Sequence, residues 1–169
     1  MTAAYDPTDH HEAAAVHHER AAHFHREAAR HYRIGGGYAE AAHQAVTAHG
    51  HALRALEHGQ AASASYAEQD GSPLPGYLTR PSGSSQTTAV GSPANLDGTA
   101  HHAVAAEHHD AAGRHHAQAG AHRSAEHYIR ASHQTKKALD HGKHAIFHGD
   151  QAALHHMEHY GSHPSAELV

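Results

Sequence analysis

Histidine and alanine dominate this chain. Of its 169 residues, 27 are His and 38 are Ala, whereas Leu, Ile, Val and Phe together number 18. So few large apolar residues leave no ordinary core. The net charge of −5, however, is smaller than the net charge typical of disordered chains, whose like charges repel one another. The absence of Cys excludes disulfides, thiolate metal sites and a Cys nucleophile. With 12 Lys and Arg against 17 Asp and Glu, we expect no nucleic-acid binding at neutral pH.

The location expected from the sequence is the cytoplasm. No apolar stretch approaches the length that spans a membrane, so no membrane contact is expected. Residues 1–10 carry neither the basic segment nor the apolar segment of a secretory signal.

The first half of the chain predicts a helical hairpin over residues 6–69. Ala, Glu, Arg and His dominate it, and its pattern repeats every seven residues. Asp6 is a candidate N-cap for a helix over 7–34, with Pro7 at its first position. The glycines 35–37 end this helix before a second one over 38–68.

A second hairpin is predicted over residues 99–161. Residues 70–98, rich in Gly, Ser, Thr and Pro, predict the flexible linker that leads to it. Its helices are expected over 99–122 and 126–160, with the turn near 123–126 and Ser124 as a candidate cap. This half lacks the triple glycine, so a single long helix remains an alternative to the hairpin.

The two halves are copies of one unit. His10 aligns with His101 at an offset of 91 residues, and after the triple glycine the offset becomes 90, which aligns His51 with His141. Nine His pairs and one Gly pair match in this way. The expected fold is therefore an all-α four-helix bundle made of two duplicated hairpins.

Histidine and alanine share one face of each predicted helix. In the heptad that begins at His10, two His and two Ala lie within an arc of about 140°. The opposite face of this helix carries Glu12, Glu19, Arg20, Arg26, Glu27, Arg30 and Arg33. We therefore expect the charged face outside and the imidazoles inside the bundle.

Buried imidazoles at this density predict metal binding. An unpaired buried ring nitrogen costs about 1–3 kcal/mol, and a metal ion removes that cost. Neutral imidazole binds copper, zinc, nickel and cobalt, and we expect several such ions, with copper first. The candidate ligands are His10, His11, His17, His18, His25, His31, His51, His58, His101, His102, His108, His109, His115, His116, His122, His141, His144, His148, His155 and His159.

Most sites must lie between helices, because residues seven apart rise about 10.5 Å along one helix. Antiparallel hairpins are expected to place His11 opposite His58, His18 opposite His51 and His25 opposite Gln44. The second copy is expected to place His102 opposite His148, His109 opposite His141 and His116 opposite Gln134. Two layers are predicted from these pairs, namely His10, His11, His58, His101, His102 and His148, and His17, His18, His51, His108, His109 and His141. A weaker third layer is expected around His25, His115 and His116.

Two other functions stay open beside metal storage and buffering. Below about pH 6 the His would charge, and the protein could bind polyanions. An Ala-lined bundle could also hold a haem between two His. An enzyme is not expected, since Glu40 to His43 is the only Glu-x-x-His motif and the inner faces offer almost no Ser, Asp or Glu. A monomer is expected, or a homodimer through Leu53, Phe147 and Leu154.

The segments HHEAAAVHHERAAHFHREAARHY and AHGHALRALEHGQAA resemble the His/Ala heptad repeats of a group of small bacterial proteins. In architecture the predicted bundle is similar to the bacterial copper-storage four-helix bundles, whose interiors are lined by metal ligands. Those proteins use Cys where this chain has His. The resemblance implies a ligand-filled bundle that stores copper or a related metal.

Overall fold

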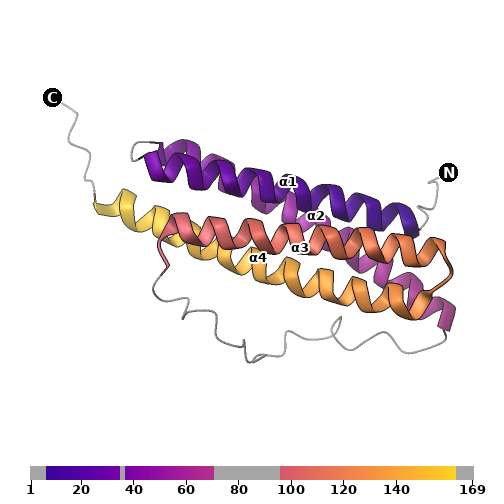
Figure 1. Ribbon diagram of the computed structural model, residues 1–169. Helices are drawn as coiled ribbons and strands as arrows, with labels where there is room; N and C mark the ends of the chain where they lie inside the picture. Colours follow the sequence, from indigo (N-terminus) through magenta and orange to yellow (C-terminus); the bar gives the residue numbers. More distant parts are fainter. Residues whose placement is uncertain (1–6, 35–36, 71–95, 163–169) are drawn as a thin grey trace, which may run out of the picture.

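The computed structural model is an all-α four-helix bundle, which confirms the predicted fold class (Figure 1). It describes residues 7–34, 37–70 and 96–162, and the side chains of 8–34, 37–66 and 96–158. The helices are α1 (Pro7–Ile34), α2 (Tyr38–Asp70), α3 (Gly98–Ser124) and α4 (Tyr128–Ser162). Their ends differ from the expected ranges by at most two residues. The Asp6 cap, glycines 35 and 36, residues 71–95 of the expected linker and the side chain of His159 lie outside the described residues.

The turn between α3 and α4 settles how the second half folds. Glu126 adopts a φ of 59°, and the His127 N–H donates to the His122 carbonyl at 2.8 Å. This pattern caps the end of a helix and reverses the chain, so the second half is a hairpin and not one long helix. At its other end, α3 begins where the Asp97 side chain accepts from the Ala100 N–H at 2.7 Å, which makes Asp97 its N-cap.

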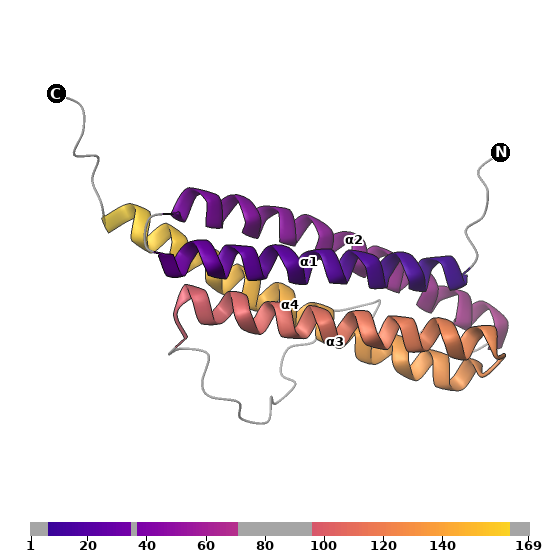
Figure 2. The same ribbon diagram turned by 45° about the horizontal axis from the view of Figure 1, so that its top comes forward.

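The two hairpins pack against each other so that the first helix of one runs antiparallel to the first helix of the other (Figures 1 and 2). Helix α1 lies beside α2 and α3, and α4 lies beside α3 and α2. Helix α1 runs antiparallel to both of its neighbours. The end of α2 lies at the opposite end of the bundle from the start of α3. The contact between α2 and α4 is the least extensive of the four seams between neighbouring helices.

Alanine and histidine make up almost the whole interior. The largest side chains that are less than 2 % exposed are Thr135 and His11, His18, His25, His101, His102, His109 and His116. Around them, alanines recur at seven-residue intervals with no exposed surface, as at Ala14, Ala21 and Ala28. On α1, Glu12, Glu19, Arg20, Arg26, Arg30 and Arg33 are exposed and Glu27 is half-buried, as the pattern predicted. None of the described helices is both long enough and apolar enough to cross a membrane.

Candidate metal centre

A single file of imidazole rings fills the seam between α1 and α3 and ends at a ring of α4. Seven histidines form it, in the order His11, His116, His18, His109, His25, His102 and His156. We call them the central column. From His11 to His102, hydrogen-bonded and stacked contacts alternate, because two antiparallel helices with His every seven residues interleave their rings about 5 Å apart. The Nδ1 atoms of His18 and His109 lie 3.1 Å apart, for example, and the ring of His109 then stacks on His25.

Two tyrosines close the ends of the central column. The hydroxyl of Tyr66 lies 2.6 Å from Nε2 of His11 at one end. At the other end the ring of Tyr32 meets the ring of His156 edge-on, with centroids 4.8 Å apart. Tyr66 was not predicted from the sequence as part of the site.

Four lateral pairs of histidines lie at the seams inside the hairpins, two in each hairpin. They are His10 with His58, His17 with His51, His101 with His148, and His108 with His141. In each lateral pair the two Nδ1 atoms lie 3.0 Å apart. All of these rings except the buried His101 are only half-buried. Solvent therefore has better access to the lateral pairs than to the central column.

The pairing expected inside each hairpin is wrong by one residue. The first His of each doublet faces the partner helix of its own hairpin, so His10 and not His11 meets His58. In the same way His17 and not His18 meets His51, His101 and not His102 meets His148, and His108 and not His109 meets His141. His115 and not His116 meets Gln134, at 2.7 Å. The second His of each doublet points instead toward the other hairpin, because consecutive helical residues diverge by about 100°.

One of the three predicted layers is confirmed and two are wrong. His17, His18, His51, His108, His109 and His141 do lie together, at the middle of the bundle. The other predicted layer is split, because α1 and α3 are antiparallel. His11 lies against His116 at one end, and His25 lies against His102 at the other. His25 is therefore not in a layer with His115 and His116.

The duplication reappears as a pseudo-twofold relation around the pair of His18 with His109. Adding the offset of 91 to the contact of His11 with His116 gives the contact of His102 with His25. Tyr66 occupies the position in the first copy that His156 occupies in the second, and Phe24 occupies the position of His115. Phe24 still keeps the ring contact of its counterpart, since it stacks on His51 as His115 stacks on His141.

In the central column, the Nε2 atoms of His18, His109 and His116 are buried with no hydrogen-bond partner. Glycines lie against two of these rings. A Cβ at Gly59 would lie 2.9 Å from Nε2 of His116, and one at Gly142 would lie 3.1 Å from Cε1 of His18. The helices α2 and α4 thus leave out side-chain volume beside these uncompensated nitrogens, each of which costs about 1–3 kcal/mol.

Burial keeps the six rings of the central column on α1 and α3 neutral. Desolvation is the largest cause that lowers the pKa of His11, His18 and His25 to about 4 and that of His102 to about 3. Burial also holds the pKa of His109 and His116 well below the usual value. In the lateral pairs the pKa of His17, His51, His58, His101, His141 and His148 is lowered, again mainly by burial, and that of His108 falls to about 4. Neutral imidazole is the form that binds metals.

Several predicted ligands lie outside the central column and the lateral pairs. His31 is half-buried beside Gly37, and the ring of His122 approaches that of His127 at the turn between α3 and α4. The exposed ring of His144 meets His108 edge-on. The ring of His155 lies 5.5 Å from that of His101, which extends the lateral rings beyond this pair.

His156 is a site residue that the sequence prediction missed. It is only 4 % exposed, and its Nε2 lies 2.9 Å from Nε2 of His102. A signal was available, because His155 and His156 form a doublet seven residues after His148 and Gly149. The second member of a doublet is the one that points to the middle of the bundle.

The ring nitrogens approach one another in pairs and not in larger groups. Across the part of the chain that the structure describes, no three His, Asp or Glu side chains converge on a point where they could hold one ion. A site here would therefore take two imidazoles from the protein and its other ligands from solvent or from small molecules.

The fold and these contacts define a four-helix bundle with a histidine-lined interior. Comparison of the chain with protein-family models, with curated proteins and with solved structures finds no match.

The glycines beside the column predict opposite effects for two Gly→Ala changes in α2. A Cβ at Gly59 would lie 2.9 Å from atoms of His116 and Leu139, whereas Gly50 is exposed with nothing within 4 Å. We expect Gly59→Ala to destabilise the metal-free protein by about 1–3 kcal/mol through overpacking. Gly50→Ala should stabilise it by about 1 kcal/mol through helix propensity. Urea unfolding followed by circular dichroism measures both, and equal effects of one sign would contradict the packing described above.

Proposed function

We propose that this protein binds and stores several transition-metal ions, without catalysing a reaction, and that it does so in the cytoplasm. The observation that carries this proposal is the repeated pairing of Nδ1 atoms, 3.0–3.2 Å apart, in the central column and the lateral pairs. If one ion were bonded to both nitrogens at about 2.0–2.1 Å, the angle between the two metal–nitrogen bonds would be about 90–105°. That range lies between square-planar and tetrahedral geometry.

The incomplete ligand sets favour storage over a structural role. Structural zinc sites are closed by four protein ligands. Each Nδ1 pair supplies only two protein ligands. The other coordination positions of the ion stay open to solvent or small molecules, through which the ion can be exchanged. The half-buried lateral pairs would bind and release ions first, and the central column would hold ions that solvent cannot reach directly.

The donor set supports copper first, and zinc, nickel or cobalt after it. Imidazole nitrogens bind all four, and affinity at a given nitrogen site rises from cobalt through nickel to copper and falls again at zinc. Hard ions such as magnesium and calcium prefer carboxylate and carbonyl oxygen. The described interior presents imidazole far more than oxygen.

Metal titration tests the proposal directly. The purified metal-free chain is titrated with each metal at pH 7.5, and bound metal is measured by inductively coupled plasma mass spectrometry after gel filtration. We expect saturation near seven copper ions, one for each Nδ1 pair. The melting temperature should rise by about 5–10 °C for each ion bound at a hundredfold excess over its Kd.

Two exposed histidines provide the matched control. His43 and His133 occupy equivalent positions in the two copies, and both are exposed. The variant His43→Gln with His133→Gln should keep the full capacity, whereas His17→Leu with His51→Leu should lose one ion. Binding of one equivalent or none by the unaltered chain would exclude storage, and so would a capacity that only the exposed histidines set.

A further inference from the structure

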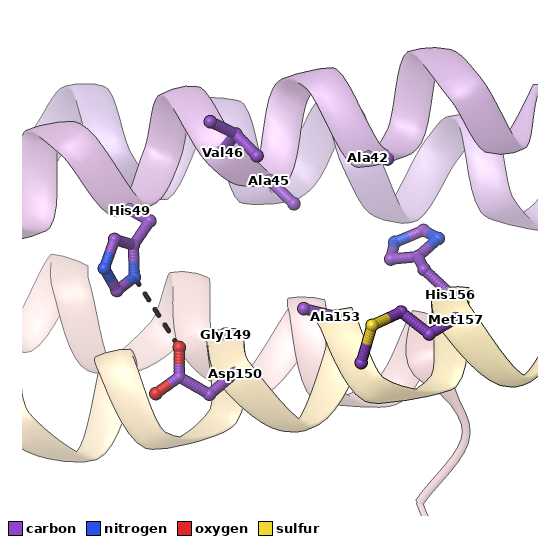
Figure 3. A pocket seen from close by; sticks show the side chains of 9 residues that line it. All are labelled: Ala42, Ala45, Val46, His49, Gly149, Asp150, Ala153, His156 and Met157. Atoms are coloured by element: carbon purple, nitrogen blue, oxygen red, sulfur yellow. Dashed lines mark ion pairs between the residues drawn. The ribbon is translucent and has the colours of Figure 1, made fainter.

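A cavity of about 530 Å³ opens between α2 and α4, near one end of the central column. Figure 3 shows His49 facing Asp150 at one side of the cavity, and His156 and Met157 at the other. The remaining lining is small and apolar, with Ala42, Ala45 and Val46 on α2 and Gly149 and Ala153 on α4. The cavity lies at the least extensive of the four helix seams.

The inner wall of the cavity touches the central column at two places. His156 lines the cavity and is also the last ring of the column, with its Nε2 2.9 Å from that of His102. Gly149 lines the cavity as well, and a Cβ there would lie 3.1 Å from Cε1 and 3.4 Å from Nε2 of His25. Between the cavity and His25 there is therefore only the backbone of a glycine at this point.

The outer part of the cavity carries donors that suit a metal cation. Met157 is 63 % exposed and offers a thioether, which is a soft ligand that selects copper(I). Nδ1 of His49 lies 3.6 Å from Oδ1 of Asp150, and both side chains are exposed to solvent. The carboxylate attracts cations to the opening, while the imidazole and the thioether offer ligands to bind them.

The other end of the bundle has different residues at the positions that correspond to His49 and His156 of the cavity. In the duplicated chain, Leu139 corresponds to His49 and Tyr66 corresponds to His156. Leu139 is 3 % exposed and Tyr66 is 5 % exposed, so both side chains are packed into the interior there. Leu139 also lies against Gly59, the counterpart of Gly149. The two copies have thus diverged at the side chains that line the cavity in one half and fill the equivalent space in the other.

We infer that this cavity is the port through which metal ions reach and leave the central column, with Met157 and His49 as outer ligands and His156 as the first ring of the store. The inference rests on the proposed storage function and specifies its route. Copper(I) is the cargo that the thioether selects, and imidazole binds copper as well, so the ion passes from the port to the store without a change of oxidation state.

The rate of copper loading tests the port separately from the capacity of the store. Copper(I) is supplied anaerobically as a coloured chelator complex, and the loss of its absorbance reports transfer to the protein. Ala153→Phe fills the cavity without removing a ligand and should slow loading and release by about tenfold. Met157→Leu should slow loading by a smaller factor at similar side-chain volume. Both variants should still bind as much copper as the unaltered chain.

A matched control and a gain of function sharpen the test. Ala103→Phe adds the same ring at an exposed position of α3 away from the cavity, and should load at the normal rate. Leu139→His with Tyr66→His copies the two histidines of the port, without the thioether, to the other end and should speed loading by up to about twofold, because two routes then operate in parallel.

The possible outcomes separate the two proposals. If the unaltered chain binds no copper, the storage function fails. If Ala153→Phe is folded by circular dichroism and loads its full complement at the normal rate, storage stands and the port is overturned. Loss of a fixed number of ions from Ala153→Phe, with an unchanged rate for the rest, would also overturn the port, because the cavity would then be a storage site.

Discussion

The metal-free protein should lose its helical structure cooperatively between about pH 6 and pH 5. The pKa of His11, His18 and His25 is about 4 in the folded protein and that of His102 about 3, against the ordinary value of 6.5. Between these values the unfolded chain binds more protons than the folded one, so stability is full above pH 6.5 and falls as the pH drops. Each such group removes about 1.4 kcal/mol of stability per pH unit, and the four together remove about 5 kcal/mol per pH unit.

This loss is comparable to the whole stability of a typical domain, about 5–15 kcal/mol. Circular dichroism at 222 nm, followed from pH 7.5 to 4.5 with a chelator present, measures the transition. Its steepness reports the protons taken up on unfolding, and we expect at least four, from the four buried histidines whose pKa is given above. The exposed pair of changes, His43→Gln with His133→Gln, should leave the midpoint in place. Helical signal retained unchanged down to pH 4.5 would show that the column does not titrate with unfolding.

Bound metal should move the same transition to lower pH. A metal ion binds only the unprotonated imidazole nitrogen, so protons and metal compete for the ring. Saturating zinc is expected to lower the acid midpoint by at least one pH unit, because two ions that contribute about 2.7 kcal/mol each, at a hundredfold excess over Kd, already offset the loss over one pH unit. The acid transition thus tests proton binding by these rings, and the metal titration tests metal binding by the same rings.

The sequence predicted the helices and the inner faces, and the reasons are local. A seven-residue repeat fixes which residues share a face, so the burial of His18 and of its counterpart His109 followed from spacing alone. The boundaries near Ile34 and Ser124 followed from glycine and turn residues close by in the chain.

The direction of one hairpin relative to the other could not be predicted in the same way. The His doublets recur every seven residues in both copies, and such a pattern matches itself whether α1 and α3 run parallel or antiparallel. Nor does the spacing tell which member of the doublet at His10 and His11 faces the partner helix, because each member lies on the inner arc. These choices depend on how whole helices pack, and they decide every contact of the central column.

The central column also shows a conflict between stability and the proposed function. The rings of His18 and His109 hydrogen-bond through Nδ1 and leave both Nε2 atoms buried without a partner. In the neutral pair one ring donates its Nδ1 proton and the other carries its proton on Nε2. One of the two bare Nε2 positions is therefore a lone pair and the other an N–H, and neither is compensated. Selection for stability alone would favour aliphatic side chains at these two positions.

The double variant His18→Leu with His109→Leu should therefore be more stable than the unaltered chain when metal-free. Removing two unpartnered buried nitrogens and replacing the rings with aliphatic side chains is expected to add about 2–4 kcal/mol to the free energy of unfolding. The acid midpoint should fall, because two buried titrating groups are gone. The copper capacity should fall by one ion, because one Nδ1 pair is lost.

The lateral variant His17→Leu with His51→Leu is the comparison that isolates the cause. It also removes one Nδ1 pair and should lose one ion, but its rings are half-buried. Removing them therefore should add much less stability, within about 1 kcal/mol of the unaltered chain. If both double variants instead destabilise the metal-free bundle equally, the central rings contribute to the fold by their packing, and the unpartnered nitrogens carry no measurable cost. A gain confined to the central variant would mean that the bundle keeps imidazoles at its centre at the expense of its own stability, as a protein that stores metal there must.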